Sequence, residues 1–232
     1  MKILHSRINN KRIYAFPSKD SFLDFITDKK KILIALNAEK LSNNDAELEK
    51  LINFNIGYAD GIGAVRALRR KGFKATKIAG AEFWLDIISK YSDTKSFYLI
   101  GATNETIIST VEKLKVDFPD IDIKGFRNGY LEKGDNLQII EDLIKTKPDF
   151  VFVAMGSPKQ EFLMQEFLNK YEACYMGLGG SFDVFSGLKK RAPKIFIKLG
   201  LEWLYRLLCE PKRIFRQLSL VKFFFKITFD RY

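Results

Sequence analysis

The sequence predicts an α/β protein, with a Rossmann-like, mainly parallel sheet that carries helices on both faces, followed by a helical basic appendage. Short apolar runs, which are typical of buried strands, alternate with amphipathic segments of helical periodicity as far as Gly180. Strands that alternate with helices of about ten to fifteen residues form right-handed βαβ units, and these build a parallel sheet. Beyond Pro193 the pattern is helical alone, so we place an α/β domain at residues 1–192 and the appendage at residues 193–232.

The predicted strands are short apolar runs, and the predicted helices place apolar side chains on one face. The strands are two short segments within residues 2–16, around a polar turn at 9–11, and residues 31–36, 54–58, 96–100, 121–126, 150–154 and 174–178. The helices begin at Ser18, at Asn43 or Asn44 and at Gly61, and further helices cover residues 81–91, 103 or 104 to 117, 135–146 and 157–169. Residues 37–40 and 177–182 are expected to be loops.

The composition is that of an ordinary soluble globular protein, with 47% hydrophobic and 29% charged residues. Cys174 and Cys209 have neither the spacing of metal ligands nor the pattern of a secreted protein, which favours a reducing, cytoplasmic compartment. We expect no signal peptide, because charge follows Met1 where an apolar run would be needed. The longest uncharged run near the sheet, residues 173–182, is about half the length that spans a bilayer, so we expect no transmembrane helix.

The positive charge is concentrated at the C-terminal end. The whole chain has a net charge of +11, and residues 189–232 hold twelve Lys and Arg against three Asp and Glu, a net charge of +9. The other 188 residues carry a net charge of only +2. This basic tail, residues 189–232, must therefore meet an anionic partner: nucleic acid, lipid headgroups or a phosphorylated substrate.

Asp60 lies where a predicted strand ends and a predicted helix begins. In an open α/β sheet, ligands bind at this edge, beside backbone N–H groups that favour anions. Gly61 and Gly63 leave the backbone accessible to a ligand. The alternative interpretation is that Asp60 only caps the helix that begins at Gly61, which is a common role of Asp.

Three more loops are predicted at the same edge, at residues 36–39, 155–161 and 177–182. In the second, Gly156 allows a tight turn, and we expect Ser157 to cap a helix with Pro158 at its first position. Lys159 and Gln160 would then lie in the first turn, where a phosphate is favoured, although the same pattern also makes a good helix start. The loop at 177–182 has room for a nucleotide.

Several common chemistries are excluded by the residues themselves. The glycines at 61 and 177 lack the third glycine of a dinucleotide fingerprint, and no phosphate-binding Gly-x-x-x-x-Gly-Lys-Ser/Thr motif is present. His5, the only histidine, lies outside the four loops, which excludes a Ser–His–Asp triad and argues against a histidine-rich metal site. One carboxylate, several amides and hydroxyls and a cationic tail remain. This set suits transfer of a group away from a phosphate leaving group, with Asp60 as the base, and burial is expected to raise the pKa of that carboxyl.

Six short motifs, in order, resemble those of the WecG/TagA/CpsF bacterial glycosyltransferases. They are Leu36-Asn37-Ala38-Glu39-Lys40, Tyr58-Ala59-Asp60-Gly61-Ile62, Gly156-Ser157-Pro158-Lys159-Gln160-Glu161, Gly179-Gly180-Ser181-Phe182-Asp183, Lys190-Arg191-Ala192-Pro193 and Gly200-Leu201-Glu202-Trp203-Leu204-Tyr205-Arg206-Leu207-Leu208. The resemblance covers residues 32–216. It is nearest to the branch that transfers N-acetylmannosaminuronic acid from its UDP donor in enterobacterial common antigen synthesis. That branch shares the runs at 37–40, 58–61 and 154–161.

The resemblance implies an inverting, metal-independent enzyme that needs no cofactor and uses a UDP-sugar. It would transfer a ManNAc-type sugar, N-acetylmannosaminuronic acid or N-acetylmannosamine, to GlcNAc on undecaprenyl diphosphate and form a β-1,4 link. Asp60 corresponds to the proposed base and Gln160 to a glutamine near the donor. Substrate contacts are further expected at Asn37, Glu39, Gly61, Gly156, Lys159, Gly179, Gly180, Asp183 and Arg191, with Arg206, Arg213 and Arg216 on the acceptor diphosphate. Where the teichoic-acid branch has Thr, this chain has Ala35, which argues against assuming that branch's donor.

Other functions remain open at this point. A nucleic-acid-binding module would explain the basic tail but not the four loops, and a nucleotide-dependent oxidoreductase would explain the sheet but lacks its motifs. Within the same family, another donor such as UDP-glucose is the main alternative. A uronic-acid donor would need a cation near the sugar, and Arg66 and Lys40 are the candidates. Both can equally be explained as solvated surface charges, which is the interpretation that we prefer.

The last segment carries an apolar stripe opposite a basic face. Its apolar residues recur at spacings of three and four, at Ile214, Leu218, Val221, Phe225 and Phe229. Such a helix suits the anionic surface of the cytoplasmic side of the inner membrane, which makes a peripheral location our expectation. Alternatively the stripe packs on the protein's own sheet or on a second subunit. If Pro211 only kinks the helix, Arg206, Arg213 and Arg216 share one side of it.

Overall fold

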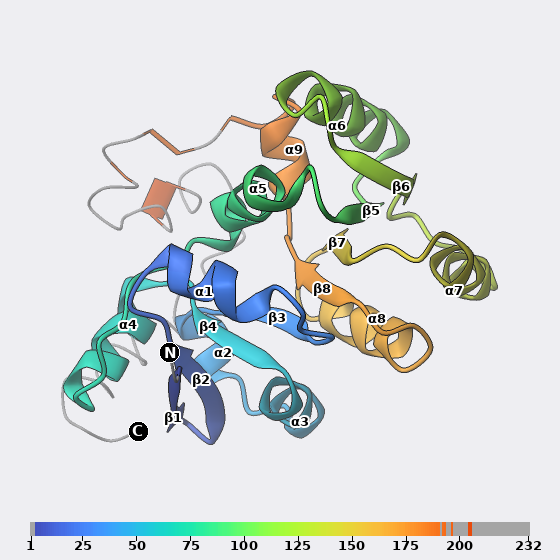
Figure 1. Ribbon diagram of the computed structural model, residues 1–232. Coiled ribbons are helices and arrows are strands. Elements are labelled where there is room, and N and C mark those ends of the chain that lie inside the picture. Colours follow the sequence, from blue (N-terminus) through green and yellow to red (C-terminus); the bar gives the residue numbers. More distant parts are fainter. Residues whose placement is uncertain (1–2, 191, 194–195, 197–203, 206–232) are drawn as a thin grey trace.

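The computed structural model describes residues 3–190, 192–193, 196 and 204–205 (Figure 1). Most of the predicted appendage lies outside these residues. So do four residues expected to bind substrate, namely Arg191, Arg206, Arg213 and Arg216. The apolar stripe between residues 214 and 229 is likewise outside the described part, and its proposed membrane contact stays a prediction.

An eight-stranded, mostly parallel sheet forms the centre of the described chain, as predicted. Its strands are β1 Leu4–Ile8, β2 Lys11–Ala15, β3 Ile32–Leu36, β4 Ile56–Ala59, β5 Ser96–Gly101, β6 Asp122–Arg127, β7 Phe150–Ala154 and β8 Cys174–Gly177. The spatial order is β1-β2-β4-β3-β8-β7-β5-β6, and only β1 runs antiparallel to its neighbour. The short hairpin of β1 and β2 closes one edge, and βαβ units build the rest.

Helices cover both faces of this sheet. They are α1 Lys19–Ile26, α2 Ala38–Ser42, α3 Ala46–Phe54, α4 Ile62–Arg70, α5 Gly80–Tyr91, α6 Asn104–Asp117, α7 Asp135–Thr146, α8 Lys159–Leu168 and α9 Ser181–Phe185. Buried side chains of α2, α3, α4, α7 and α8 belong to one core layer, and those of α1, α5, α6 and α9 belong to the other. Figure 1 shows α5, α6 and α9 on one side of the strands and α3 and α8 on the other. The predicted doubly covered α/β fold is therefore confirmed.

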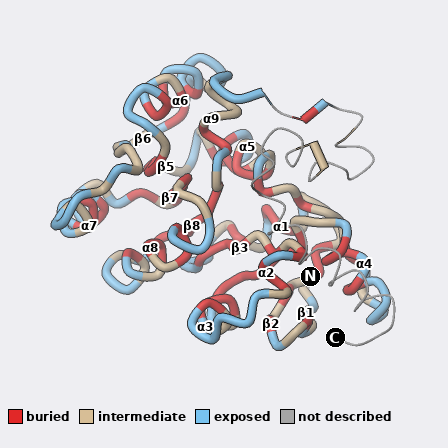
Figure 2. Tube along the Cα trace, turned by 180° about the vertical axis from the view of Figure 1, so that it is seen from behind, coloured by how far each residue is buried: buried red, intermediate tan, exposed pale blue. Residues whose placement is uncertain are grey.

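The alternation of side chains along β7 shows why the central strands are apolar throughout. Val151 and Val153 point into one core layer, while Phe150 and Phe152 point into the other. There their rings stack on Phe97 of β5, with centroids 5.7 and 5.9 Å away. A parallel strand covered on both faces needs apolar residues at every position. Figure 2 shows the result, with buried segments along the strands and exposed ones on the outer helix surfaces.

Several local predictions were wrong. The short helices α2 and α9 begin inside the segments 37–40 and 177–182, which were expected to be loops. The third helix is capped by Asp45, whose carboxylate accepts two backbone N–H groups, and not by Asn43 or Asn44. α8 begins after Pro158, and no side chain, including that of Ser157, caps it. No helix in the described part of the chain is long and apolar enough to cross a membrane.

Candidate active site

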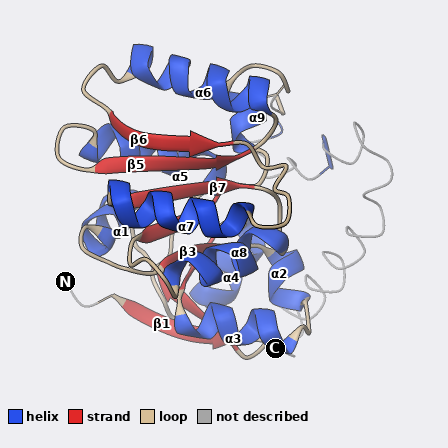
Figure 3. Ribbon diagram, turned by 90° about the vertical axis from the view of Figure 1, so that its right-hand side faces the viewer, coloured by secondary structure: helices blue, strands red, loops and turns tan. Residues whose placement is uncertain are grey.

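The four loops singled out from the sequence leave four neighbouring strands. Asp60 follows β4, Asn37 follows β3, Gly179 follows β8 and Gly156 follows β7, and these strands are consecutive in the sheet. Because the strands are parallel, their carboxyl ends share one edge, toward which the arrows of Figure 3 point. This edge is where open α/β sheets bind ligands. The structure thus confirms that the loops share an edge, and it adds their order along it.

Asp60 is half-buried at this edge and is held by two different elements. Its backbone N–H donates to Leu36 O at 3.2 Å, and its Oδ1 accepts the N–H of Gly80 at 2.9 Å. Gly80 is the first residue of α5, so the carboxylate lies at the positive end of that helix. The N-cap of α4 is Gly61, which has no side-chain cap. The alternative in which Asp60 caps the helix beginning at Gly61 is therefore wrong.

Asn37 lies directly beside Gly61 and begins α2. Its Oδ1 accepts the N–H of Lys40 at 2.9 Å, which makes it the N-cap of this helix. A Cβ placed on Gly61 would lie 3.9 Å from Asn37, so the loops after β4 and β3 are in contact. Glu39, in the first turn of α2, is exposed. The expected substrate contacts of these residues remain predictions.

The sequence suggested that Lys40 is either a cation near the sugar or a solvated surface charge, and the structure supports neither interpretation. Its side chain is only 11% exposed, and its Nζ lies 2.5 Å from Oε1 of Glu161, whose side chain is 1% exposed. This buried ion pair joins α2, after β3, to α8, after β7. A lysine held in this way is not a solvated surface charge, and it is not available to the carboxylate of a sugar. Arg66, the other candidate, is exposed on α4.

Gln160 joins the loops after β7 and β8. It is 3% exposed, and its Oε1 accepts the N–H groups of Gly156 at 3.1 Å and of Gly179 at 2.9 Å. Both glycines have positive φ, 79° and 60°, a conformation that side chains disfavour. A Cβ on Gly177 would lie 2.4 Å from Gln160 Nε2, so a side chain at this position would displace the Gln160 amide. Gln160 therefore shapes the edge; its contact with a donor stays a prediction.

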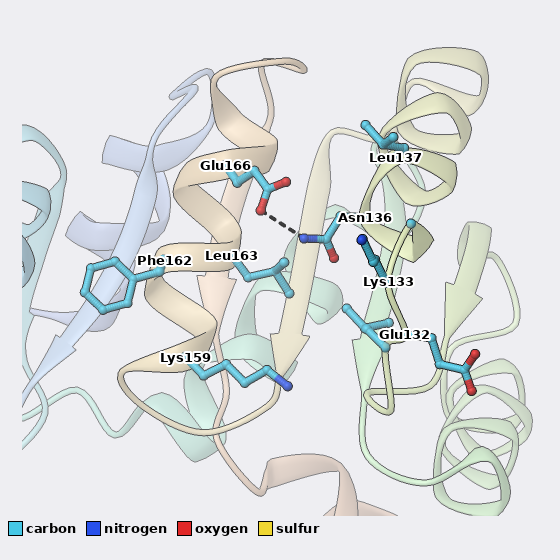
Figure 4. Close-up of a pocket in the computed structure, with 10 residues that line it drawn as sticks. Glu132, Lys133, Asn136, Leu137, Lys159, Phe162, Leu163 and Glu166 are labelled. Carbon is cyan, nitrogen blue, oxygen red and sulfur yellow. Dashed lines mark hydrogen bonds between the residues drawn. The ribbon is translucent and has the colours of Figure 1, made fainter.

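Three predicted residues remain, and they lie in the segments that follow β7 and β8. Gly180 is exposed, and Asp183 is half-buried with its Oδ2 2.8 Å from Lys189 Nζ. Lys159 is exposed and lines a cavity of about 660 Å³ between α7 and α8 (Figure 4). Glu166 and Asn136 meet across this cavity in a 2.9 Å hydrogen bond. None of the cavity's lining residues belongs to the loops after β4, β3 or β8.

Sequence reasoning did not include the loops after β5 and β6, which end at the same edge. Gly101 and Ala102 both have positive φ, 135° and 57°, and Gly129 N–H donates to Ala102 O at 2.8 Å. A Cβ on Gly129 would lie 3.0 Å from Gly101 Cα, so the two turns are in close contact. The signal that could have found them was Gly101 at a strand end, two residues before the helix cap Thr103.

Tyr58 lies on β4, two residues before Asp60, and is fully buried. Burial, and next the negative charges of Asp60 and Glu161, raise its pKa well above the ordinary value, so the phenol is neutral. Its hydroxyl has no hydrogen-bond partner among the described residues. The ring contacts Phe22 and Phe83, with centroids 5.1 and 6.3 Å away.

No group of three or more His, Cys, Asp or Glu side chains lies together as a metal site within the described residues. The site instead offers a carboxylate, buried amides and the backbone of glycine-rich turns. This arrangement places the protein among the α/β enzymes that bind their substrates at the carboxyl edge of a parallel sheet. The whole chain, residues 1–232, matches the model of the glycosyl transferase WecG/TagA/CpsF family, and the protein belongs to that family. It is therefore a glycosyltransferase, which decides between the classes left open by the sequence.

Proposed function

We propose that this enzyme moves a ManNAc-type sugar from a UDP donor to GlcNAc-diphospho-undecaprenol, with inversion, to form a β-1,4 link for a bacterial cell-surface polysaccharide. The observation that carries the proposal is the position of Asp60. Its carboxylate lies where the loops of four neighbouring parallel strands converge, and one of its oxygens is fixed by the first N–H of α5. The membership of the family supports glycosyl transfer.

In the proposed reaction, Asp60 takes the proton of the acceptor hydroxyl as the hydroxyl oxygen attacks the anomeric carbon of the donor. The new glycosidic bond forms while the bond from that carbon to the UDP oxygen breaks on the opposite face. UDP leaves with the electron pair of that bond. A general base held in place contributes about 10²- to 10⁴-fold to such a step.

The leaving diphosphate needs positive charge, and the proposal assigns this to the protein itself. At the carboxyl edge, the N-terminus of α4 follows Gly61 and has no side-chain cap, and such a helix N-terminus favours anions. The tail arginines Arg206, Arg213 and Arg216 would add charge-assisted contacts to the acceptor diphosphate. With these groups, no metal or other cofactor is required in the proposed mechanism.

The identity of the donor sugar depends on the charges beside it, and one observation bears on this. A uronic-acid sugar needs a cation beside its carboxylate, and Lys40 already neutralises Glu161. Arg66 remains exposed on α4 and could serve a uronic acid. The neutral sugar N-acetylmannosamine needs no such cation. The second candidate is UDP-glucose with the same acceptor, because Ala35 stands where the teichoic-acid branch has a hydroxyl.

The experiment is to incubate the full-length protein with lipid-linked GlcNAc and each of several UDP-sugars, and to identify the product by mass. The panel contains UDP-N-acetylmannosamine, UDP-N-acetylmannosaminuronic acid, UDP-glucose and UDP-GlcNAc. The proposal expects a disaccharide product with one of the first two donors. A product with UDP-glucose alone selects the second candidate. Absence of transfer from every UDP-sugar, with a control enzyme active on the same acceptor, refutes the proposal.

A further inference from the structure

The N-terminus of α5 is hydrogen-bonded to the end of β4. Ile78 N–H donates to Ala59 O at 2.9 Å, and two residues later Gly80 N–H donates to Asp60 Oδ1 at 2.9 Å. Gly80 is buried, and the N-cap residue, Ala79, offers no side-chain hydrogen bond to the helix. The carboxylate of Asp60 thus takes the place of a capping side chain for α5, from a position twenty residues away along the chain.

The position of Gly80 leaves no room for a side chain. A Cβ there would lie 2.7 Å from the Tyr58 hydroxyl oxygen, closer than real Cβ contacts allow. The next atoms, Ala35 Cβ and Met176 Cε, would lie at 3.6 and 3.8 Å, which are ordinary van der Waals distances. The hydroxyl oxygen of Tyr58 is therefore the single atom among the described residues that excludes alanine from position 80.

The Tyr58 ring is not free to yield to such a Cβ. It is fully buried between Phe22 and Phe83, and core side chains of this kind pack without voids. A methyl group at position 80 would therefore move the start of α5 instead of the ring. That movement would draw the N–H of residue 80 away from Asp60.

We propose that Gly80 is a positioning residue for Asp60: by lacking a Cβ it lets the first N–H of α5 reach over the Tyr58 hydroxyl and fix the carboxylate. The terminal torsion of an aspartate is broad, so a hydrogen bond is needed to set the direction of its oxygens. The proposal rests on the proposed role of Asp60 as the base. It adds a residue that touches neither substrate and acts only through that carboxylate.

The test is a rescue experiment with Gly80→Ala, Tyr58→Phe and the double variant Tyr58→Phe/Gly80→Ala. Turnover and KM are measured with the UDP-sugar donor that the full-length enzyme uses. Gly80→Ala should lower kcat by about tenfold or more with a nearly unchanged donor KM, because a displacement of about 1 Å can cost up to about a hundredfold. In the double variant the nearest contacts of the new Cβ are at 3.6 and 3.8 Å, so kcat should return close to the wild-type value. Tyr58→Phe alone removes a hydroxyl without a partner among the described residues and should keep normal turnover.

A second readout follows the hydrogen bond without turnover. The backbone amide proton of residue 80 should change its chemical shift with pH as Asp60 titrates, and this change should be absent in Asp60→Asn. Gly80→Ala should lose the response and the double variant should regain it. If this pattern is found while Asp60→Asn keeps full turnover, the positioning stands and the role of Asp60 as the base fails.

Three outcomes overturn the proposal. Gly80→Ala could turn over at the wild-type rate while Asp60→Asn is impaired, the amide response could survive in Gly80→Ala, or the double variant could stay as impaired as Gly80→Ala. If Gly80→Ala alone does not fold, the double variant decides, because it lacks the clash. A folded double variant with normal kcat and a normal amide response supports the proposal. A folded but impaired double variant refutes it.

Discussion

Breaking the buried ion pair between Lys40 and Glu161 should destabilise the protein far more than breaking a more exposed pair of nearly the same length. Lys40 Nζ and Glu161 Oε1 are 2.5 Å apart, with side chains 11% and 1% exposed. Lys40→Met leaves the Glu161 carboxylate buried, with Gln160 Nε2 at 3.3 Å as its remaining hydrogen-bond donor among the described side chains. Its other oxygen, Oε2, already lacks a partner among the described residues.

Removing one partner of a buried pair costs about 3–5 kcal/mol, because the other charge stays in a poorly solvated place. For a chain of this size, 1 kcal/mol corresponds to about 2–4 °C in Tm, so we expect Lys40→Met to lower Tm by about 6–20 °C. The matched control is Lys19→Met. Its partner Asp86 is 2.6 Å away, but the two side chains are 38% and 34% exposed. Such a surface pair contributes about 0–1 kcal/mol.

The assay is thermal and urea unfolding of the full-length protein, its Lys40→Met, Glu161→Gln and double variants, and Lys19→Met. The double variant removes both charges, so it should cost about 0.5–3 kcal/mol less than the sum of the two single variants. The reasoning is refuted if Lys40→Met costs no more than Lys19→Met. It is also refuted if the two single costs are simply additive, since the two residues would then not depend on each other.

Three further predictions concern the metal, the tail and pH. EDTA should leave transferase activity intact, as measured by product mass; loss of activity that Mg²⁺ or Mn²⁺ restores would contradict the metal-free mechanism. Truncation before Pro211 should leave a folded protein that binds UDP but does not process the lipid-linked acceptor. Anionic liposomes should retain only the full-length form, and this binding should weaken as the salt concentration rises. Full activity of the truncated form on that acceptor would rule out the arginine contacts. Burial alone would raise the pKa of Asp149, but hydrogen bonds from the Ser96 N–H and hydroxyl, together with Lys95, lower it below the usual value. Because the folded-state pKa is the lower one, this carboxylate stabilises the fold above the unfolded pKa of about 4, and its contribution is lost as pH falls through the folded pKa. Urea unfolding from pH 6 to pH 3 should show this loss in the wild type and a smaller one in Asp149→Asn; equal pH dependence of the two would contradict it.

The central fold was predictable because its signals are local. Each parallel strand is an apolar run, each long helix has an apolar face, and the alternation of the two defines βαβ units. The two helices that were missed, α2 and α9, have five residues each, too few for a periodic pattern to show. The position of Asp60 at the sheet edge was predicted for the same local reason, since it follows a strand and precedes a helix.

The contacts that shape the site could not be predicted, because they join residues far apart in the chain. Asp60 binds Gly80 of the next helix instead of capping its own, and no local pattern distinguishes the two. Lys40 resembles a surface charge in the sequence, and only the fold brings Glu161, 121 residues later, beside it. The role of Gln160 could not be predicted either, because its hydrogen bond to Gly179 depends on β7 and β8 being neighbours in the sheet.

The most direct test of the central claim is the turnover of Asp60→Asn. The side-chain oxygen of Asn can still accept the N–H of Gly80, so the account predicts a folded protein with unchanged UDP binding. It predicts a kcat lower by about a hundredfold or more, because the amide cannot take a proton from the acceptor hydroxyl. A variant that folds, binds UDP and transfers sugar at nearly the wild-type rate would contradict the account, and Asp60 would then serve only to hold α5.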